Sequence, residues 1–142
     1  MIVLDTTVLA YAVGVDHPLK QASERIVAAV ARGSMHATTT VEVIQEFLHI
    51  RSRRLGRPDA VATARSFAHL LSPLLILDEA ALERGMGLFE RHEGLGAFDA
   101  VLAAASIDHG ADALVSADRA FGVVRRLPFV ELGTPALERL LG

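Results

Sequence analysis

With 142 residues, 51% of them hydrophobic, the chain is long enough for one domain with a substantial core. No apolar run approaches the ~20 residues of a membrane-spanning helix, which excludes an integral membrane protein of that kind. The formal net charge of −3 excludes a chain coated in positive charge for generic nucleic-acid binding, so any contact with nucleic acid must be local.

The first half of the chain alternates strand patterns with helix patterns. Residues 2–5, "IVLD", read as a buried strand that is apolar up to Asp5, and residues 6–13 continue as a short helix. In residues 19–33 apolar side chains recur at helical spacing, which predicts a second helix. Residues 35–39 are a short strand candidate, and a long helix is predicted over residues 41–55.

The second half continues this alternation. Its predicted elements are, in chain order, a helix over 59–72, a strand over 74–78, helices over 79–93 and 98–110, strands over 113–117 and 129–132, and a helix over 134–141. Gly85 and Gly87 are expected to weaken the helix that contains them. The strands are apolar throughout instead of alternating, which is typical of a parallel sheet covered on both faces. We therefore expect a single α/β domain over residues 1–142, with a parallel sheet between two helical layers.

The N-terminus and the cysteine content bear on where the protein resides. Met1 is followed at once by a strand pattern, without the basic segment and cleavage site of a signal peptide. The chain has no cysteine, so it has no disulfide framework and no thiolate that could bind a metal or act as a nucleophile. Both features agree with a reducing compartment, and we expect a cytoplasmic protein that contacts no membrane.

Acidic residues stand where the predicted strands end. Asp5 follows the first strand and Asp118 follows residues 113–117, while Asp99 and a glutamate of "VEVIQEFL" lie on helices that can overhang the same edge. Ligands of open parallel sheets bind beyond the carboxyl ends of the strands. Each aspartate taken alone is explained by helix capping, worth about 1 kcal/mol, but capping does not explain why four acids gather at one edge.

Such a gathering of acids needs a compensating charge. Four carboxylates in one pocket repel each other by about 4 kcal/mol for each close pair at an effective dielectric constant of about 20. The only lysine, Lys20, lies in an early helix and offers no relief, whereas a divalent cation would. Because oxygen ligands select hard ions, the sequence predicts Mg²⁺ or Mn²⁺. The early position of Lys20 also excludes a phosphoacceptor receiver domain, which needs a lysine after a late strand.

Two glutamates compete for the helical position in this set. Glu42 and Glu46 are four residues apart and only ~40° apart around the helix, so both project in similar directions. Glu42 has polar neighbours, whereas Glu46 lies between Val43 and Ile50 at helical contact spacing. A carboxylate in apolar surroundings needs a partner, so we favour Glu46 and keep Glu42 as a possible auxiliary.

Four segments carry a resemblance to a known family. In order and spacing, "IVLDTTVL", "TTTVEVIQEFLHI", "FDAVLAAAS" and "LVSADRAF" resemble the four motifs of PIN-domain nucleases, most closely those of the VapC-type toxins of bacterial toxin–antitoxin pairs. The resemblance runs from Met1 to about Leu132. It implies a PIN-like α/β/α sandwich in which the acidic ligands are Asp5, Glu46, Asp99 and Asp118.

The resemblance also assigns neighbours to these acids. Thr6 and Ser116 would be hydroxyl residues that orient the carboxylates or a bound water. Two positions depart from the family pattern: Thr7 stands where the family often has Asn or Ser, and Ala117 stands where it often has Asn before the last aspartate. Neither change removes a carboxylate, but the second removes an amide that would support Asp118.

The function implied by the resemblance is that of a Mg²⁺- or Mn²⁺-dependent endoribonuclease. Metal-assisted hydrolysis needs no ribose 2′-hydroxyl as nucleophile, so it predicts RNA products with 5′-phosphate and 3′-hydroxyl ends. The resemblance further implies a cognate VapB-like antitoxin, which blocks the acidic pocket by inserting an arginine in place of the cation, and a homodimer of the toxin.

Positive charge is concentrated at the end of the predicted helix 41–55. Arg51, Arg53, Arg54 and Arg57 lie there, in "RSRRLGR". Arginines at this position either complement the negative end of the helix dipole or contact RNA phosphates, and the sequence favours neither interpretation.

Two other functions stay open at this stage. One is a PIN-like fold that binds RNA or protein without catalysis, in which case a conservative Asp99→Asn change would leave function intact. The other is a metal-free ribonuclease that uses two of the six histidines, although these show no metal-ligand spacing. Chelation by EDTA would leave that second activity unchanged.

Overall fold

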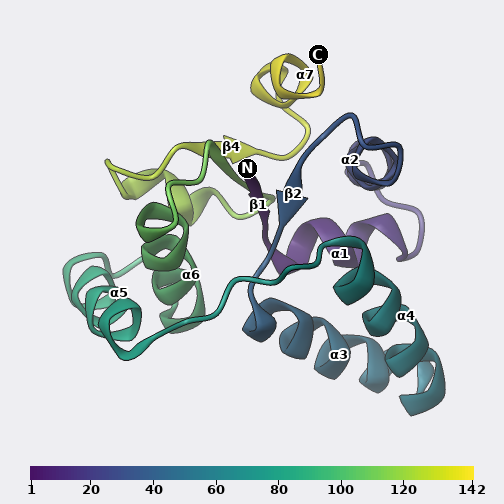
Figure 1. Ribbon diagram of the computed structural model, residues 1–142, viewed down its shortest axis with the longest axis horizontal. Helices are drawn as coiled ribbons and strands as arrows, with labels where there is room; N and C mark the ends of the chain where they lie inside the picture. Colours follow the sequence, from purple (N-terminus) through teal and green to yellow (C-terminus); the bar gives the residue numbers. More distant parts are fainter.

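A four-stranded parallel sheet with the strand order β2–β1–β3–β4 lies at the centre of the computed structural model, which describes residues 1–142 (Figure 1). The strands are β1 (Ile2–Leu4), β2 (Ala37–Thr38), β3 (Ala113–Ser116) and β4 (Phe129–Glu131). β1 and β3 are buried along their whole length, which is why their sequences are apolar without alternation. The predicted parallel sheet is confirmed.

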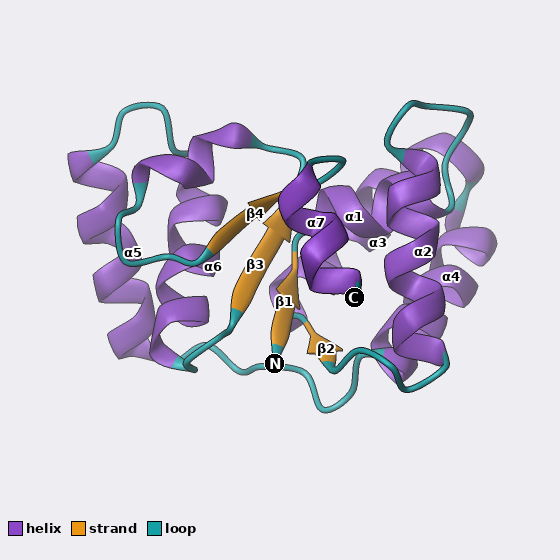
Figure 2. Cartoon of the chain, turned by 90° about the horizontal axis from the view of Figure 1, so that it is seen from above, coloured by secondary structure: helices purple, strands orange, loops and turns teal.

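Helices cover the sheet from two sides. Figure 2 shows α5 and α6 on one side of the strands and α1 to α4 on the other. The helices are α1 (Thr6–Ala12), α2 (Lys20–Ala31), α3 (Val41–Leu55), α4 (Arg57–Leu70), α5 (Glu79–Arg91), α6 (Ala97–Asp108) and α7 (Pro135–Leu141), with a 3₁₀ helix η1 (Arg119–Val123) after β3. This arrangement confirms the predicted α/β fold class.

The strand order creates a switch point between β1 and β3. From β1 the chain passes to β2 on one side and later returns to β3 on the other side. The backbone N–H of Asp5 donates to the carbonyl of Val115 at 3.0 Å, so pairing continues to the carboxyl end of both strands. Parallel sheets bind ligands at such points, and here the switch point brings Asp5 beside Ser116.

The predicted strand over residues 74–78 is wrong. Only Leu75 makes a strand-like pairing, and this is an isolated parallel bridge to Thr40, just after β2. β2 has only two residues, and Thr40 already serves as the N-cap of α3. The extended backbone at β2 is therefore too short for residues 74–78 to pair with it as a strand. The side chain of Ile76 is 76% exposed, which also differs from the buried strand that its apolar sequence predicts.

α5 and α6 form an antiparallel hairpin that touches through Gly85. A Cβ atom at this position would lie 2.7 Å from the Cα of Val101, so only glycine permits the contact. A Cβ at Gly87 would meet only the guanidinium of Arg91, at 3.4 Å. The expectation that both glycines simply weaken the helix is therefore incomplete: Gly85 allows the hairpin to close.

The hydrophobic core is a single cluster that joins the sheet to both helical layers. Phe47 of α3 and Phe121 of η1 are its largest fully buried side chains. Phe47 packs edge to face against Phe67 of α4, with ring centroids 5.2 Å apart. No helix of the chain is both long enough and apolar enough to span a membrane.

Candidate active site

Asp5 occupies the N-cap position of α1 but does not cap it. The carboxylate accepts no backbone N–H of the helix, so it makes no capping hydrogen bond. Instead, its Oδ2 accepts hydrogen bonds from Ser116 Oγ at 2.6 Å and Thr7 Oγ1 at 3.0 Å. The side chain is only 4% exposed, and two hydroxyl groups satisfy this buried carboxyl group. Helix capping alone does not explain this residue.

Ser116 at the end of β3 and Thr7 at the start of α1 hold the two segments together. Ser116 Oγ donates to Asp5 and also accepts the backbone N–H of Asp118 at 2.9 Å. Thr7 Oγ1 accepts the backbone N–H of Ala117 at 3.0 Å. The two hydroxyls therefore orient Asp5 and hold the turn that carries Asp118 in the same network. In the sequence, Thr7 is noted only as a departure from the family pattern. In the structure its hydroxyl helps to orient the Asp5 carboxylate.

Glu46 joins the site from α3. Its Oε2 accepts a hydrogen bond from Thr6 Oγ1 at 2.9 Å, which ties the middle of α3 to the start of α1. The residue is exposed, so the expectation of apolar surroundings for its carboxylate is wrong. Val43 is buried because it faces the core, and Glu46 one turn later projects into solvent at the cleft.

Asp99 lies in the first turn of α6 and carries the clearest electrostatic signature of the site. Partial burial, followed by the charges of Asp5, Asp118 and Glu46, raises the pKa of Asp99 from 3.8 to about 7. A carboxyl group with three acidic neighbours and no cation nearby favours its neutral form. The four acids predicted from sequence therefore form one interacting group.

Asp118 differs from the other three because it does cap a helix. Its Oδ1 accepts the backbone N–H of Ala120 at 2.9 Å, at the start of η1. It is exposed and lies beside the cleft rather than among the residues that line it. Of the three aspartates for which capping was considered, only this one has a capping hydrogen bond.

The cleft between α3 and the α5–α6 hairpin has a volume of about 480 Å³. Six carboxylates and no lysine or arginine line it, and they belong to Asp5, Glu42, Glu46, Asp78, Glu79 and Asp99. The opposite wall is apolar and includes Phe98, whose side chain is 79% exposed. The side chains stand apart, since no three acidic or histidine residues are close enough to hold one metal ion together.

Two further acids of the cleft, Asp78 and Glu79, come after an apolar segment, as the predicted aspartates Asp5 and Asp118 do. Asp78 comes directly after the apolar residues 74–77, as Asp5 and Asp118 come after their strands. Its Oδ1 accepts the N–H of Ala81 at 2.8 Å and so caps α5. Both Asp78 and its neighbour Glu79 line the cleft, and neither contributes to the raised pKa of Asp99.

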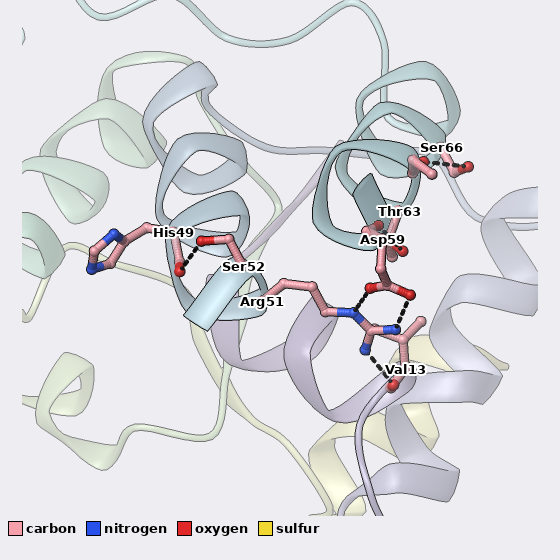
Figure 3. Close-up of polar contacts among 8 residues, drawn as sticks. Val13, His49, Arg51, Ser52, Asp59, Thr63 and Ser66 are labelled. Carbon is pink, nitrogen blue, oxygen red and sulfur yellow. Dashed lines mark hydrogen bonds and ion pairs between the residues drawn. The ribbon is translucent and has the colours of Figure 1, made fainter. Parts of the chain in front are cut away.

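The basic cluster predicted near the end of α3 does not face the cleft as a group. Arg51 Nε donates to Asp59 Oδ1 at 2.6 Å, and its Nη1 donates to the carbonyl of Val13 at 2.7 Å (Figure 3). Arg51 therefore fixes α3 to α4 and to the end of α1. Its guanidinium is already occupied, whereas Arg53 and Arg54 stay exposed on the last turn of α3.

Comparison with known proteins bears directly on this site. Residues 2–127 match the PIN domain family. The chain is 48% identical to ribonuclease VapC7 of Mycobacterium tuberculosis, with the alignment covering 100% of this chain and 99% of that protein. It is 29% identical to the VapC ribonuclease Mb1869c of Mycobacterium bovis, over 85% of this chain and 92% of the relative.

Solved structures share the fold at lower sequence identity. VapC20 of Mycobacterium tuberculosis, a sarcin–ricin loop cleaving toxin, superposes with a TM-score of 0.74 at 19% identity, covering 88% of this chain and 95% of that one. VapBC2 of Rickettsia felis, bound to a DNA fragment from its promoter, gives a TM-score of 0.69 at 19% identity over 93% and 99%. The family match and the full-length similarity confirm the resemblance carried by the four motifs: the chain belongs to the PIN domain family and, within it, to the VapC ribonuclease toxins.

Proposed function

We propose that this VapC-type ribonuclease hydrolyses RNA phosphodiester bonds with a Mg²⁺ or Mn²⁺ ion held by Asp5, Glu46, Asp99 and Asp118. The observation that carries the proposal is the gathering of carboxylates from the turn after β1, from α3 and from α6 in one cleft that no cationic side chain lines. The hydroxyl network around Asp5 supports it, because it holds a buried carboxylate in one orientation without neutralising it. The raised pKa of Asp99 agrees with this gathering.

The donor set fits a hard divalent cation. All candidate ligands are carboxylate oxygens, and no histidine or cysteine lines the cleft. Glu46 and Asp118 are the two exposed members, and each is held by one hydrogen bond, from Thr6 Oγ1 and from the N–H of Ala120. Sharing one ion requires these two carboxylates to turn toward Asp5 and Asp99. Asp5 Oδ2 accepts both hydroxyl hydrogen bonds, which leaves Oδ1 as the oxygen for a ligand.

The residues of the site then have separate tasks in hydrolysis. A bound divalent cation would supply Lewis acidity: it would lower the pKa of a water molecule, so that a nucleophile is available at neutral pH. Asp5, fixed by Ser116 and Thr7, sets the position of the site relative to the sheet edge. Asp118 lies beside the cleft, where its carboxylate can orient the attacking water on the phosphorus. In-line attack of water on the phosphorus breaks the bond to the ribose 3′-oxygen, which takes up a proton, and this yields 5′-phosphate and 3′-hydroxyl ends.

We further propose a VapB-like antitoxin as the partner that blocks this cleft. The acidic lining without a cation suits an inserted arginine, which would form charge-assisted hydrogen bonds with the carboxylates. The apolar wall, with Leu82 47% and Phe98 79% exposed, suits apolar residues on either side of that arginine. Other exposed apolar side chains, among them Met86 and Phe89 of α5, supply surface for the proposed homodimer.

Cleavage of an end-labelled, structured RNA pool tests the enzymatic proposal. The purified, antitoxin-free protein is incubated with Mg²⁺ or Mn²⁺ and, in parallel, with EDTA, and the product ends are mapped. We expect cleavage only with the metal ion, and 5′-phosphate ends. Cleavage that survives EDTA or leaves 2′,3′-cyclic phosphate would support the metal-free alternative instead. RNA binding without cleavage by the folded, metal-loaded protein would support the non-catalytic alternative.

A further inference from the structure

A second depression lies on the other side of the α5–α6 hairpin, away from the acidic cleft. Its volume is about 610 Å³, and it is bounded by the second half of α5, the second half of α6 and the segment that follows η1. Arginines dominate its charged lining, with Arg84, Arg91, Arg125 and Arg126 set against only two carboxylates. We call this depression the arginine groove.

Three of these arginines have no acidic partner. Arg84 is paired with Asp108 across the hairpin, so its charge is already compensated. Arg91, Arg125 and Arg126 take part in none of the ion pairs of the chain. All three are exposed, and Arg91 comes from the end of α5 whereas the other two come from the loop before β4. Tertiary folding therefore brings Arg91 to the adjacent pair Arg125 and Arg126, which is distant from it in the sequence.

The arginine groove lies close to the acidic site along the chain. Asp118 caps η1 at one end, and Val123, the last residue of η1, lines the groove at the other. At ~2.0 Å per residue, the 3₁₀ helix bridges about 10 Å. η1 also packs against α6, the helix that carries Asp99. A chain of RNA held at the carboxylates needs only a few nucleotides to reach the arginines.

The charges on the two sides explain why a second site is needed. The cleft presents six carboxylates, which repel a polyanion even when a divalent cation is bound among them. Guanidinium groups bind phosphate oxygens with paired hydrogen bonds, and phosphate contacts supply most of the sequence-independent affinity for nucleic acid. The apolar part of the groove, with Leu88, Ile107 and Val123, offers surface to ribose and base faces of an unpaired strand.

We propose that the arginine groove is a phosphate-binding subsite for a single-stranded segment of the RNA substrate that flanks the cleavage site. Arg91, Arg125 and Arg126 contact the backbone phosphates, while chemistry takes place at the acidic cleft. This inference rests on the proposed function, because it takes RNA as the substrate. It also moves the expected phosphate contacts away from Arg51, which is engaged by Asp59.

The test compares two double variants. Arg125→Gln combined with Arg126→Gln removes charge from the groove, and Arg65→Gln combined with Arg139→Gln removes the same charge from exposed, unpaired arginines on α4 and α7. The affinity for a fluorescein-labelled single-stranded RNA is measured by anisotropy in EDTA at several salt concentrations. KM and kcat for cleavage are measured with Mg²⁺ or Mn²⁺.

For the groove variant we expect RNA affinity to fall about tenfold and KM to rise by a similar factor, with kcat unchanged. The slope of log affinity against log salt should decrease by about 1.4, the value for two lost phosphate contacts on a single strand. The control variant should match the wild type. A salt slope unchanged in the groove variant, or equal losses in both variants, would overturn the inference.

Two further results separate this inference from neighbouring proposals. If the wild type binds RNA through the arginine groove but does not cleave it with either metal ion, the proposed function fails and the subsite stands. If a polyglutamate peptide loses affinity for the groove variant while RNA does not, the groove belongs to an acidic protein segment and the RNA subsite is overturned.

Discussion

The α5–α6 hairpin separates two depressions of opposite charge. The cleft on one side is lined by six carboxylates without a cation, and the groove on the other side is lined by four arginines and two carboxylates. The net charge of −3 conceals this division. A modestly acidic chain can therefore act on RNA, because the local distribution of charge, rather than its total, decides where a polyanion binds.

The two depressions also differ in how firmly their side chains are held. In the cleft, Asp5 receives two hydroxyl hydrogen bonds and Glu46 receives one from Thr6. In the groove, Arg125 and Arg126 are exposed and take part in no ion pair. Catalysis requires groups held in place within a fraction of an ångström, whereas backbone phosphate contacts tolerate mobile side chains. The difference supports chemistry on one side and binding on the other.

The strongest way to break this division is to alter the cleft alone. Asp99→Asn removes one charge of the acidic group without changing its shape, and we expect kcat to fall by about a thousandfold because metal binding and water activation are impaired. RNA affinity measured in EDTA should stay equal or rise slightly, since repulsion is reduced. Glu79→Gln, another cleft acid, is the control and should change kcat less than about threefold. Asp99→Asn with more than a tenth of wild-type activity would contradict the assignment.

A smaller effect is expected when only the orientation of Asp5 is disturbed. Ser116→Ala removes the 2.6 Å hydrogen bond to Asp5 and the acceptor for the N–H of Asp118, and we expect cleavage to fall about 10- to 100-fold. Ser106→Ala is the matched control, because Ser106 is also fully buried and donates only to the carbonyl of Leu102. Both variants should lose about 1 kcal/mol of unfolding free energy. Equal activities in the two variants would show that Ser116 is merely structural.

The hairpin that separates the depressions is sensitive at one glycine. Gly85→Ala places a Cβ 2.7 Å from Val101, and we expect the unfolding free energy to fall by about 1 to 3 kcal/mol in urea titrations. Gly87→Ala on the same helix meets only the flexible end of Arg91 and should be neutral or stabilise by up to about 1 kcal/mol. If the two variants have the same stability, close packing through Gly85 is not what holds α5 against α6.

The smallest predicted effect is the pH dependence of stability in the metal-free protein. The pKa of Asp99 is raised from 3.8 to about 7 on folding, so the folded state retains a proton that the unfolded state has lost. This contribution to stability is fully present below about pH 4 and is lost as pH rises toward 7. Because Asp99 is only partly buried, we expect a decrease of about 1 to 2 kcal/mol between pH 4.5 and 7.5 in EDTA.

Thermal and urea unfolding of wild type and Asp99→Asn in the same buffers checks this dependence. The variant cannot ionise at this position, so its stability should change less over the same range. A parallel decrease in both proteins would assign the effect to other groups.

Sequence position alone was enough to locate the principal acids. Asp5 and Asp118 follow apolar strands whose parallel pairing carries both to one sheet edge, whereas Asp99 is brought there by the packing of α6 against β3. Glu46 was preferred because an apolar environment was predicted for it, and its carboxylate does not have that environment. Helical spacing could not predict its hydrogen bond with Thr6, because Thr6 belongs to a different helix. Their roles as ligands stay predictions. Which aspartate caps a helix also depended on tertiary contacts, because the Asp5 carboxylate accepts the hydroxyls of Ser116 and Thr7 instead of a backbone N–H of α1.

By itself, the sequence determined the alternation of strands and helices, the parallel sheet and the family, because these depend on periodicity and order along the chain. Only the tertiary structure decided that residues 74–78 form no strand, that Gly85 is a contact point, and that Arg51 is engaged. It also brought Arg91 beside the loop before β4. These features depend on contacts between segments that are distant in the sequence. Local patterns of hydrophobicity and charge carry no information about such contacts.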